Sequence, residues 1–169
     1  MGLTDIMPVG EWNELVREFH DRSGLCCSVA DVTGAHVSNH QNFCNTLCPR
    51  IKESPEALKS ICAVAAQNFT VQAQKSGQPV VGECDAGMVK VAVPIFLGGT
   101  LLGTAGGCGG LMPDGEIEDF MIAKTTGMGA KEITLLSATV PVISLQQARE
   151  FADYAMERIS HIMACAVAG

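Results

Sequence analysis

Three extended runs in the middle of the chain constrain its fold more than any other feature. Residues 79–84, 88–97 and 100–106 have the composition of β-strands, and Gly98 and Gly99 are suited to a hairpin turn between the second and third runs. Strands joined by such short turns pair antiparallel, because a parallel pair needs a crossover of roughly a dozen residues or more. The sequence therefore predicts an antiparallel sheet.

The segments around these strands are predominantly helical. Residues 10–22 carry apolar side chains at helical spacing and end near a glycine, and residues 25–32 form a further β-type run. Helices are predicted within residues 42–52, from the Ser54-Pro55 pair to Gly77, and over residues 114–126. This order predicts an α+β fold of the PAS/GAF kind, a central antiparallel sheet flanked by helices that lie over one face.

The last segment predicts one long helix over residues 144–166. Its apolar residues follow alternating steps of three and four and form a seam: Leu145, Ala148, Ala152, Ala155, Ile159, Ile162 and Ala166. Two interpretations are open: the seam packs on its own domain, or it pairs with a second copy or continues into an output module. We expect residues 1–169 to form a single domain, with 144–166 as an output or dimerisation helix in a homodimer.

Composition and charge exclude several classes of protein. Of 169 residues 47% are apolar, and 11 basic residues face 18 acidic ones, for a net charge of −7. This content of apolar residues excludes intrinsic disorder. Since no cluster of Lys or Arg is present, we expect no direct nucleic-acid or membrane binding. No signal peptide or long apolar run stands out, so the expected location is the cytoplasm.

Eight cysteines are many for a chain of this kind. Under reducing conditions, such richness indicates a metal site, redox chemistry or core packing before it indicates disulfides. Cys44 and Cys48 share one face of a helix, Cys62 lies on the next helix and Cys84 ends a strand. Four such thiolates could hold an iron–sulfur cluster or Zn²⁺, although no pair has zinc-ribbon spacing. The alternative is that they are small buried residues.

The other candidate residues give weaker signals. Cys108 stands in a glycine-rich strand end and is either an additional thiolate or part of a flexible end, whereas Cys26, Cys27 and Cys165 are typical of packing. His36 and His40 belong to a polar loop and could supply a ligand or a hydrogen bond. No nucleophile–base arrangement or catalytic carboxylate pair is present, so no catalytic residue is predicted.

Several of these motifs together resemble the PocR-type sensory domain, a PAS-like ligand-binding module of bacterial and archaeal regulators and histidine kinases. The resemblance covers about residues 10–165 and rests on four segments: residues 43–48, Cys62, the Cys84-Asp85-Ala86-Gly87 turn and the Val93-Pro94-Ile95 strand. It continues through the glycine-rich strand end and the Val140–Ser144 segment.

The resemblance implies a sensor of a small ligand or metal cofactor, not an enzyme, with a downstream kinase or DNA-binding module as partner. By position, Cys48, Cys62 and Cys84 match the family's cysteines. Asp85 replaces the usual His of the turn, and the Gly107-Cys108 region replaces a Gly-Gln pair.

The extra thiols Cys44 and Cys108 favour a soft metal or a [4Fe–4S] cluster, with zinc or no metal as alternatives. We therefore predict metal ligation by Cys44, Cys48, Cys62 and Cys84, with Cys108 as the competitor for the fourth position. Cys48, Cys62 and Cys84 are expected to share one ligand shell.

The ligand itself is expected to contact Cys108, Asp85 and His40. Two other functions stay open. One is an iron–sulfur redox or electron-transfer protein, and the other is an interaction domain with buried thiols that contains no metal.

Overall fold

A computed structural model describes residues 1–169 and contains one four-stranded sheet. The strands lie in the order β1-β4-β3-β2, and each neighbouring pair is antiparallel. Their bounds are β1 Cys26–Asp31, β2 Val80–Glu83, β3 Val89–Leu97 and β4 Thr100–Gly110. The predicted α+β, PAS/GAF-like fold with an antiparallel sheet is confirmed.

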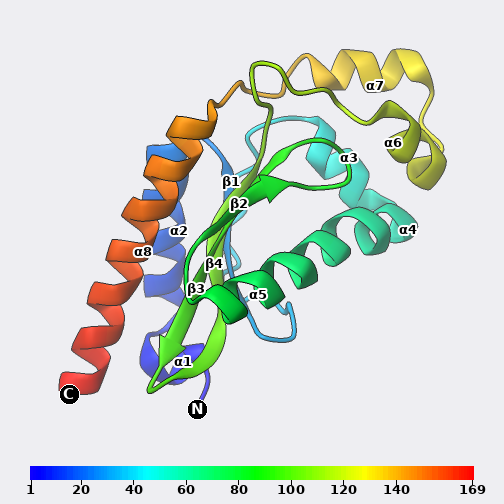
Figure 1. Ribbon diagram of the computed structural model, residues 1–169. Helices are drawn as coiled ribbons and strands as arrows, with labels where there is room; N and C mark the ends of the chain where they lie inside the picture. The colour runs from blue at the N-terminus through cyan, green and yellow to red at the C-terminus, as the bar shows by residue number, and fades with distance from the viewer.

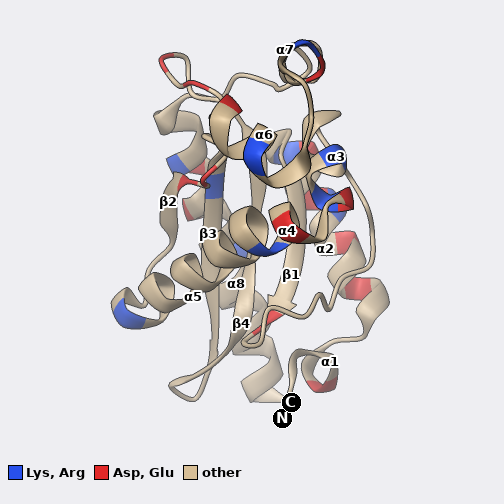
Figure 2. Cartoon of the chain, turned by 90° about the vertical axis from the view of Figure 1, so that its right-hand side faces the viewer, with Lys and Arg blue, Asp and Glu red and all other residues tan.

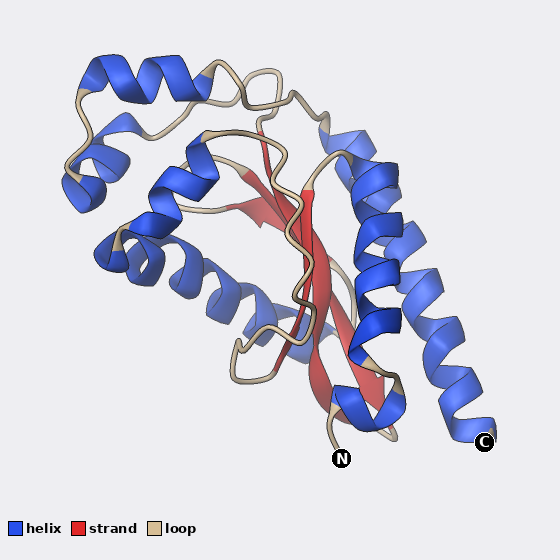
Figure 3. Ribbon diagram, turned by 180° about the vertical axis from the view of Figure 1, so that it is seen from behind, coloured by secondary structure: helices blue, strands red, loops and turns tan.

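Helices cover both faces of this sheet, not one face as predicted. The helices are α1 Leu3–Ile6, α2 Val9–Ser23, α3 Leu47–Glu53, α4 Pro55–Ala57, the π-helical turn η1 Leu58–Ala63, α5 Val64–Ser76, α6 Asp119–Thr126, α7 Ala130–Ser137 and α8 Leu145–Ala168. Figure 1 shows α2 and α8 on one side of the sheet and α3 to α5 on the other, with α6 and α7 beyond one end. The view from behind shows the same layers (Figure 3).

Alternate residues of each strand face opposite layers, because directly paired residues of an antiparallel sheet point the same way. Cys27 and Val29 of β1 and Val91 and Val93 of β3 are buried in the main core with the apolar faces of α2 and α8. Cys26, the neighbour of Cys27 along β1, therefore points to the layer of α3 to α5. A second, smaller core lies among α3, η1, α6 and α7.

Two helices differ from the sequence prediction at their starts, and one was missed. The helix predicted over 114–126 begins at Asp119, and the one predicted within 42–52 begins at Leu47. In the second case Asn42 and Asn45 use their side chains to bond the backbone of Cys27 and Cys48, which competes with helix formation. Helix α7 was not predicted.

The long C-terminal helix is confirmed, with a capping box between Ser144 and Gln147 at its start. Its seam packs on this domain's own sheet and α2: Ala148, Ala152, Ala155 and Ile159 are all buried there. Of the two interpretations of the seam, packing on the same domain is the one observed. None of the helices combines the length and hydrophobicity that a membrane crossing requires.

Candidate functional site

Six of the eight cysteines gather on the sheet face that α3 to α5 overlie. Cys26 and Cys108 come from β1 and β4, Cys44 and Cys48 from the loop before α3 and from α3, Cys62 from η1, and Cys84 from the end of β2. All six are free thiols. Cys108 interacts electrostatically with each of the other five, and Lys52 interacts with several of them. We call this surface the cysteine face.

The backbone at the centre of the cysteine face is shaped by a β-bulge at Gly109. The pairing with β3 skips this residue, since Lys90 pairs with Cys108 but Val89 pairs with Gly110. Gly109 has φ +100°, and a Cβ atom there would lie 2.9 Å from the Cys44 sulfur. Glycine is therefore required twice, for its conformation and for the close approach of this thiol.

Asn45 ties the bulge to α3. Its side-chain amide donates to the Gly109 carbonyl oxygen at 2.9 Å, and its carbonyl oxygen accepts from the Cys48 backbone N–H at 2.7 Å. The same amide lies 3.4 Å from the Cys48 sulfur. One buried side chain thus sets the position of Cys48 relative to β4.

Replacing Asn45 by alanine is expected to destabilise the fold by about 2–3 kcal/mol, because it leaves the buried Cys48 N–H without a partner and the buried Gly109 carbonyl with only the weak Cys44 thiol donor. Urea denaturation measures this change. Gln41→Ala, at an exposed position of the preceding loop, is the matched control and is expected to change stability by less than about 0.5 kcal/mol. Equal effects of the two substitutions would contradict the role given to Asn45.

Three residues form one row across the cysteine face. Cys26 pairs with Cys108, and Cys108 pairs on its other side with Lys90. The next row towards the other end of the strands consists of small residues, Ser28 and Gly106 among them. No residue of this second row has a large side chain that would fill the space above the sheet.

The cysteine face is less completely covered than the opposite face. Partly exposed residues on it are Cys26, Ser28, Ala30, Lys90, Thr104 and Cys108. Their neighbours on the other face, which include Cys27, Val29, Val91 and Ala105, are at most 2% exposed. Solvent and solutes can therefore reach one side of the same strands but not the other.

Cys108 is the most acidic thiol of the cysteine face. The Cys26 thiol lowers the pKa of Cys108 well below its usual range, and Lys90, Lys52 and His36 add to this effect while burial opposes it. The pKa of Cys26 is correspondingly raised by its interaction with Cys108. Of the two thiols, Cys108 is therefore the more acidic.

The remaining thiols of the face are protonated at neutral pH. Burial raises the pKa of Cys44, Cys62 and Cys84, and it raises the pKa of Cys48 to about 12. Burial alone would lower the pKa of Lys52, but its electrostatic interactions with Cys62 and Cys108 outweigh burial, so that this pKa is raised. Lys52 therefore faces the thiols as a cation.

Neither Lys52 nor Lys90 forms an ion pair with a carboxylate. The four ion pairs of the structure use arginines only, and Lys90 lies 5.9 Å from the centre of the Phe69 ring. Elsewhere, lysines and arginines alternate with acidic residues without forming a broad basic patch on the side that Figure 2 shows. The two lysines of the cysteine face are thus free to meet negative charge.

Of the residues predicted as metal ligands, Cys48, Cys62 and Cys84 all border the second core, and Cys44 lies beside Gly109. Cys62 sits on the π-helical turn, a feature found often at functional sites. However, no three Cys, His, Asp or Glu side chains are arranged so that they could hold a metal ion. The shared ligand shell of Cys48, Cys62 and Cys84 therefore stays a prediction.

The residues predicted to contact a ligand lie in different surroundings. Cys108 is central to the cysteine face. Asp85 is exposed in the turn after β2, and the His40 backbone N–H donates to Asn13 of α2. His36, which the sequence considered beside His40, is the histidine whose charge acts on Cys108.

Sequence reasoning missed Cys26, Asn45, Lys52 and Lys90. Cys26 was interpreted as packing, although it alternates with Cys27 along a strand and must face the other layer. The lysines gave no signal, because only strand pairing and helix docking bring residues 52 and 90 to the same thiols. For Asn45, its position beside Cys44 and three residues before Cys48 was the available clue.

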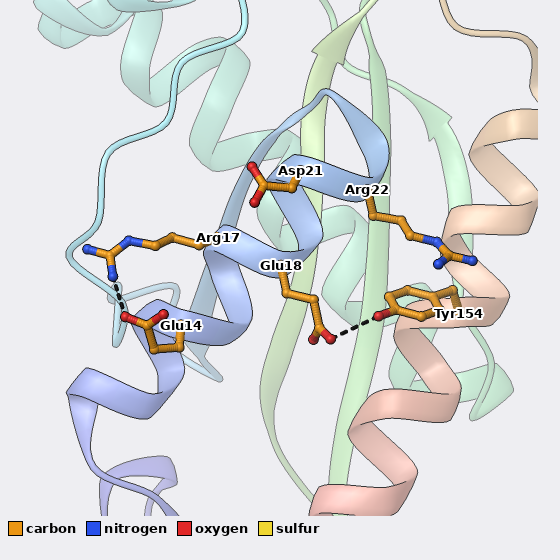
Figure 4. Close-up of a pocket in the computed structure, with 6 residues that line it drawn as sticks. All are labelled: Glu14, Arg17, Glu18, Asp21, Arg22 and Tyr154. Carbon is orange, nitrogen blue, oxygen red and sulfur yellow. Dashed lines mark hydrogen bonds and ion pairs between the residues drawn. The ribbon is translucent and has the colours of Figure 1, made fainter.

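A hollow of about 580 Å³ lies between α2 and α8 on the opposite side of the sheet. Figure 4 shows contacts between the side chains of its lining other than Asp21. Glu18 accepts from the Tyr154 hydroxyl at 2.9 Å, and the Arg22 guanidinium lies 3.9 Å from the centre of the Tyr154 ring. Glu14 pairs with Arg17. Because these groups already satisfy one another, the cysteine face is the stronger candidate site.

Comparison with known proteins finds a similarity to a bacterial regulator. The regulatory protein PocR of Salmonella typhimurium is 26% identical over 91 residues, which are 54% of this chain and 29% of that protein. The chain thus spans less than a third of its curated relative. A solved structure described as MglB with a tetrameric arrangement has a TM-score of 0.46 and 14% identity, and the match covers 94% of this chain and 92% of the other.

The decisive match is to a family model. The sensory domain found in PocR matches residues 5–166, which include the second core, all of the main core except Leu3, the whole sheet and every cysteine of the face described above. The chain belongs to the PocR sensory-domain family.

Proposed function

We propose that this domain is the sensor of a signalling protein or transcriptional regulator, that it acts without catalysis, and that a small ligand binds on the cysteine face. The observation that carries the proposal is the contrast between the two faces of the sheet. One face is sealed by α2 and α8, whereas the other is partly exposed and presents thiols and two unpaired lysines. A kinase or DNA-binding module on a longer protein is the proposed recipient of the signal.

The lysines favour ligands that carry negative charge. Lys52 comes from α3 and Lys90 from β3, so a ligand between them contacts both the helical layer and the sheet. The protein as a whole has a net charge of −7 and repels anions, which makes a local pair of cations the distinguishing feature of this face. We therefore propose small organic carboxylates as the class to test first.

The test is thermal denaturation of the reduced full chain in the presence of a panel of short-chain carboxylates, with the corresponding alcohols as uncharged counterparts. A ligand at about 100 times its Kd adds about 2.7 kcal/mol of stability, and for a chain of this size that corresponds to a rise in Tm of about 5–10 °C.

The stabilisation is expected to disappear in Lys90→Ala and to persist in Lys124→Ala, an exposed lysine on α6. Stabilisation by a carboxylate that is equal in the two variants would contradict binding at this face. Stabilisation by the alcohols alone would retain the site but reject the charge of the ligand.

A second candidate is a metal centre, zinc or a [4Fe–4S] cluster, held by Cys44, Cys48, Cys62 and Cys84. It is favoured by the number of thiols and by Lys52 and Lys90, which would offset the negative charge that four thiolates acquire on binding. The thiols would first have to move together. Metal analysis and an absorbance spectrum of protein purified without oxygen decide the matter, and Cys27→Ala is the matched control for Cys48→Ser.

A further inference from the structure

Cys26 and Cys108 face each other across the pairing of β1 with β4. Directly opposed residues of an antiparallel pair have Cα atoms about 4.5 or 5.5 Å apart. A disulfide requires a Cα separation of about 4.4–6.8 Å. Both side chains are on the cysteine face, both are partly exposed and both are free thiols.

From this register we propose that Cys26 and Cys108 are a redox-active pair, which closes to a disulfide when the domain meets a hydroperoxide. The bond needs no rearrangement of the sheet, because the two strands already hold the two residues in register. The bond uses none of Cys44, Cys48, Cys62 and Cys84, so a metal bound by these four thiols and a disulfide here do not exclude one another.

Two other thiols are near enough to compete, and the structure argues against each. Cys27 is adjacent to Cys26 in sequence but points into the main core on the other side of the sheet. The Cys44 thiol is directed at backbone oxygens, 3.6 Å from that of Cys108 and 3.5 Å from that of Gly109. Cys26 is therefore the partner of Cys108.

The reaction has two steps. Cys108 attacks the terminal oxygen of the hydroperoxide as a thiolate, and the O–O bond breaks. The departing alkoxide or hydroxide takes a proton from solvent and leaves as an alcohol or water, so that Cys108 becomes a sulfenic acid. The Cys26 thiol then attacks this sulfur, the S–S bond forms, and water carries away the hydroxyl and the proton of Cys26. Lys90, paired with Cys108 on the other side, places a positive charge beside the attacking sulfur.

The experiment uses the full chain with Cys165→Ser, because exposed Cys165 can cross-link two copies. The reduced protein is treated with one equivalent of hydrogen peroxide without oxygen. We expect the loss of two free thiols, a mass decrease of about 2 Da for the two hydrogens removed, and a single linked peptide pair that contains Cys26 and Cys108. Thioredoxin or dithiothreitol is expected to restore both thiols.

Two variants separate this pair from its neighbours. Cys26→Ser is expected to abolish the linked peptide and leave sulfenic acid on Cys108, which dimedone labels, whereas Cys27→Ala is expected to react as the parent does. A linked pair of Cys44 with Cys108, or no loss of thiols with ten equivalents of peroxide, would overturn the proposal. The peptide map of the parent decides the question even if Cys26→Ser does not fold.

Discussion

Replacing Gly106 by alanine is expected to destabilise the fold by more than about 4 kcal/mol, a large part of the roughly 5–15 kcal/mol that holds a domain of this size together. Gly106 lies in the middle of β4, between Ser28 of β1 and Ala92 of β3. A Cβ atom on it would lie 1.9 Å from the carbonyl oxygen of Val91. Since this obstacle is backbone, the two central strands would have to separate.

Circular dichroism and urea denaturation measure the effect. Gly10→Ala is the matched control, because Gly10 lies in α2, and a Cβ atom there would meet nothing within 4 Å. This control is expected to gain up to about 1 kcal/mol from the better helix propensity of alanine. A Gly106→Ala protein as stable as the parent would mean that β3 and β4 approach each other less closely than described.

Substituting glutamate for Ile159 is expected to unfold the domain, not to separate a dimer. Ile159 is 2% exposed and packs in the main core beneath α8. An unpaired carboxylate there costs several kcal/mol, or binds a proton to avoid the cost. We expect the loss of cooperative thermal unfolding, detected by near-ultraviolet circular dichroism and calorimetry.

Glu157→Gln, on the exposed side of the same helix, is the control and is expected to change stability by less than about 0.5 kcal/mol. Ile162→Glu is expected to lie between the two, because Ile162 is only partly buried. A folded Ile159→Glu protein with half the mass of the parent in light scattering would restore the interpretation of the seam as a subunit interface.

The sheet could be predicted from local signals because its turns are short. Gly98 and Gly99 both have positive φ, and the strands on either side pair as a hairpin, as the two glycines indicated. The same holds at Gly24 and Gly77, which end α2 and α5 in the left-handed conformation. What sequence could not provide was the side on which each helix packs, since that depends on contacts between distant segments.

The candidate site was predictable in its residue type but not in its arrangement. The predicted cysteines do gather on one face, and Cys108 is central to it. The register of β1 on β4 decides that Cys26 joins them, and a register shift of a single residue would have presented Cys27 instead. The bulge at Gly109 and the lysines Lys52 and Lys90 likewise depend on pairing between segments far apart in sequence.

Side chains along each strand point alternately to the sealed face and to the open face, so neighbouring residues have different roles. Along β4, Ala105 is buried against α2 and α8, while Thr104 and Cys108 are open to the other side. Selection on what the domain recognises can therefore change Thr104 or Cys108 while Ala105 keeps the core closed. A library that varies only the open positions of β1, β3 and β4 would alter recognition on a scaffold whose stability is set elsewhere, which makes this sheet a suitable starting point for engineered sensors.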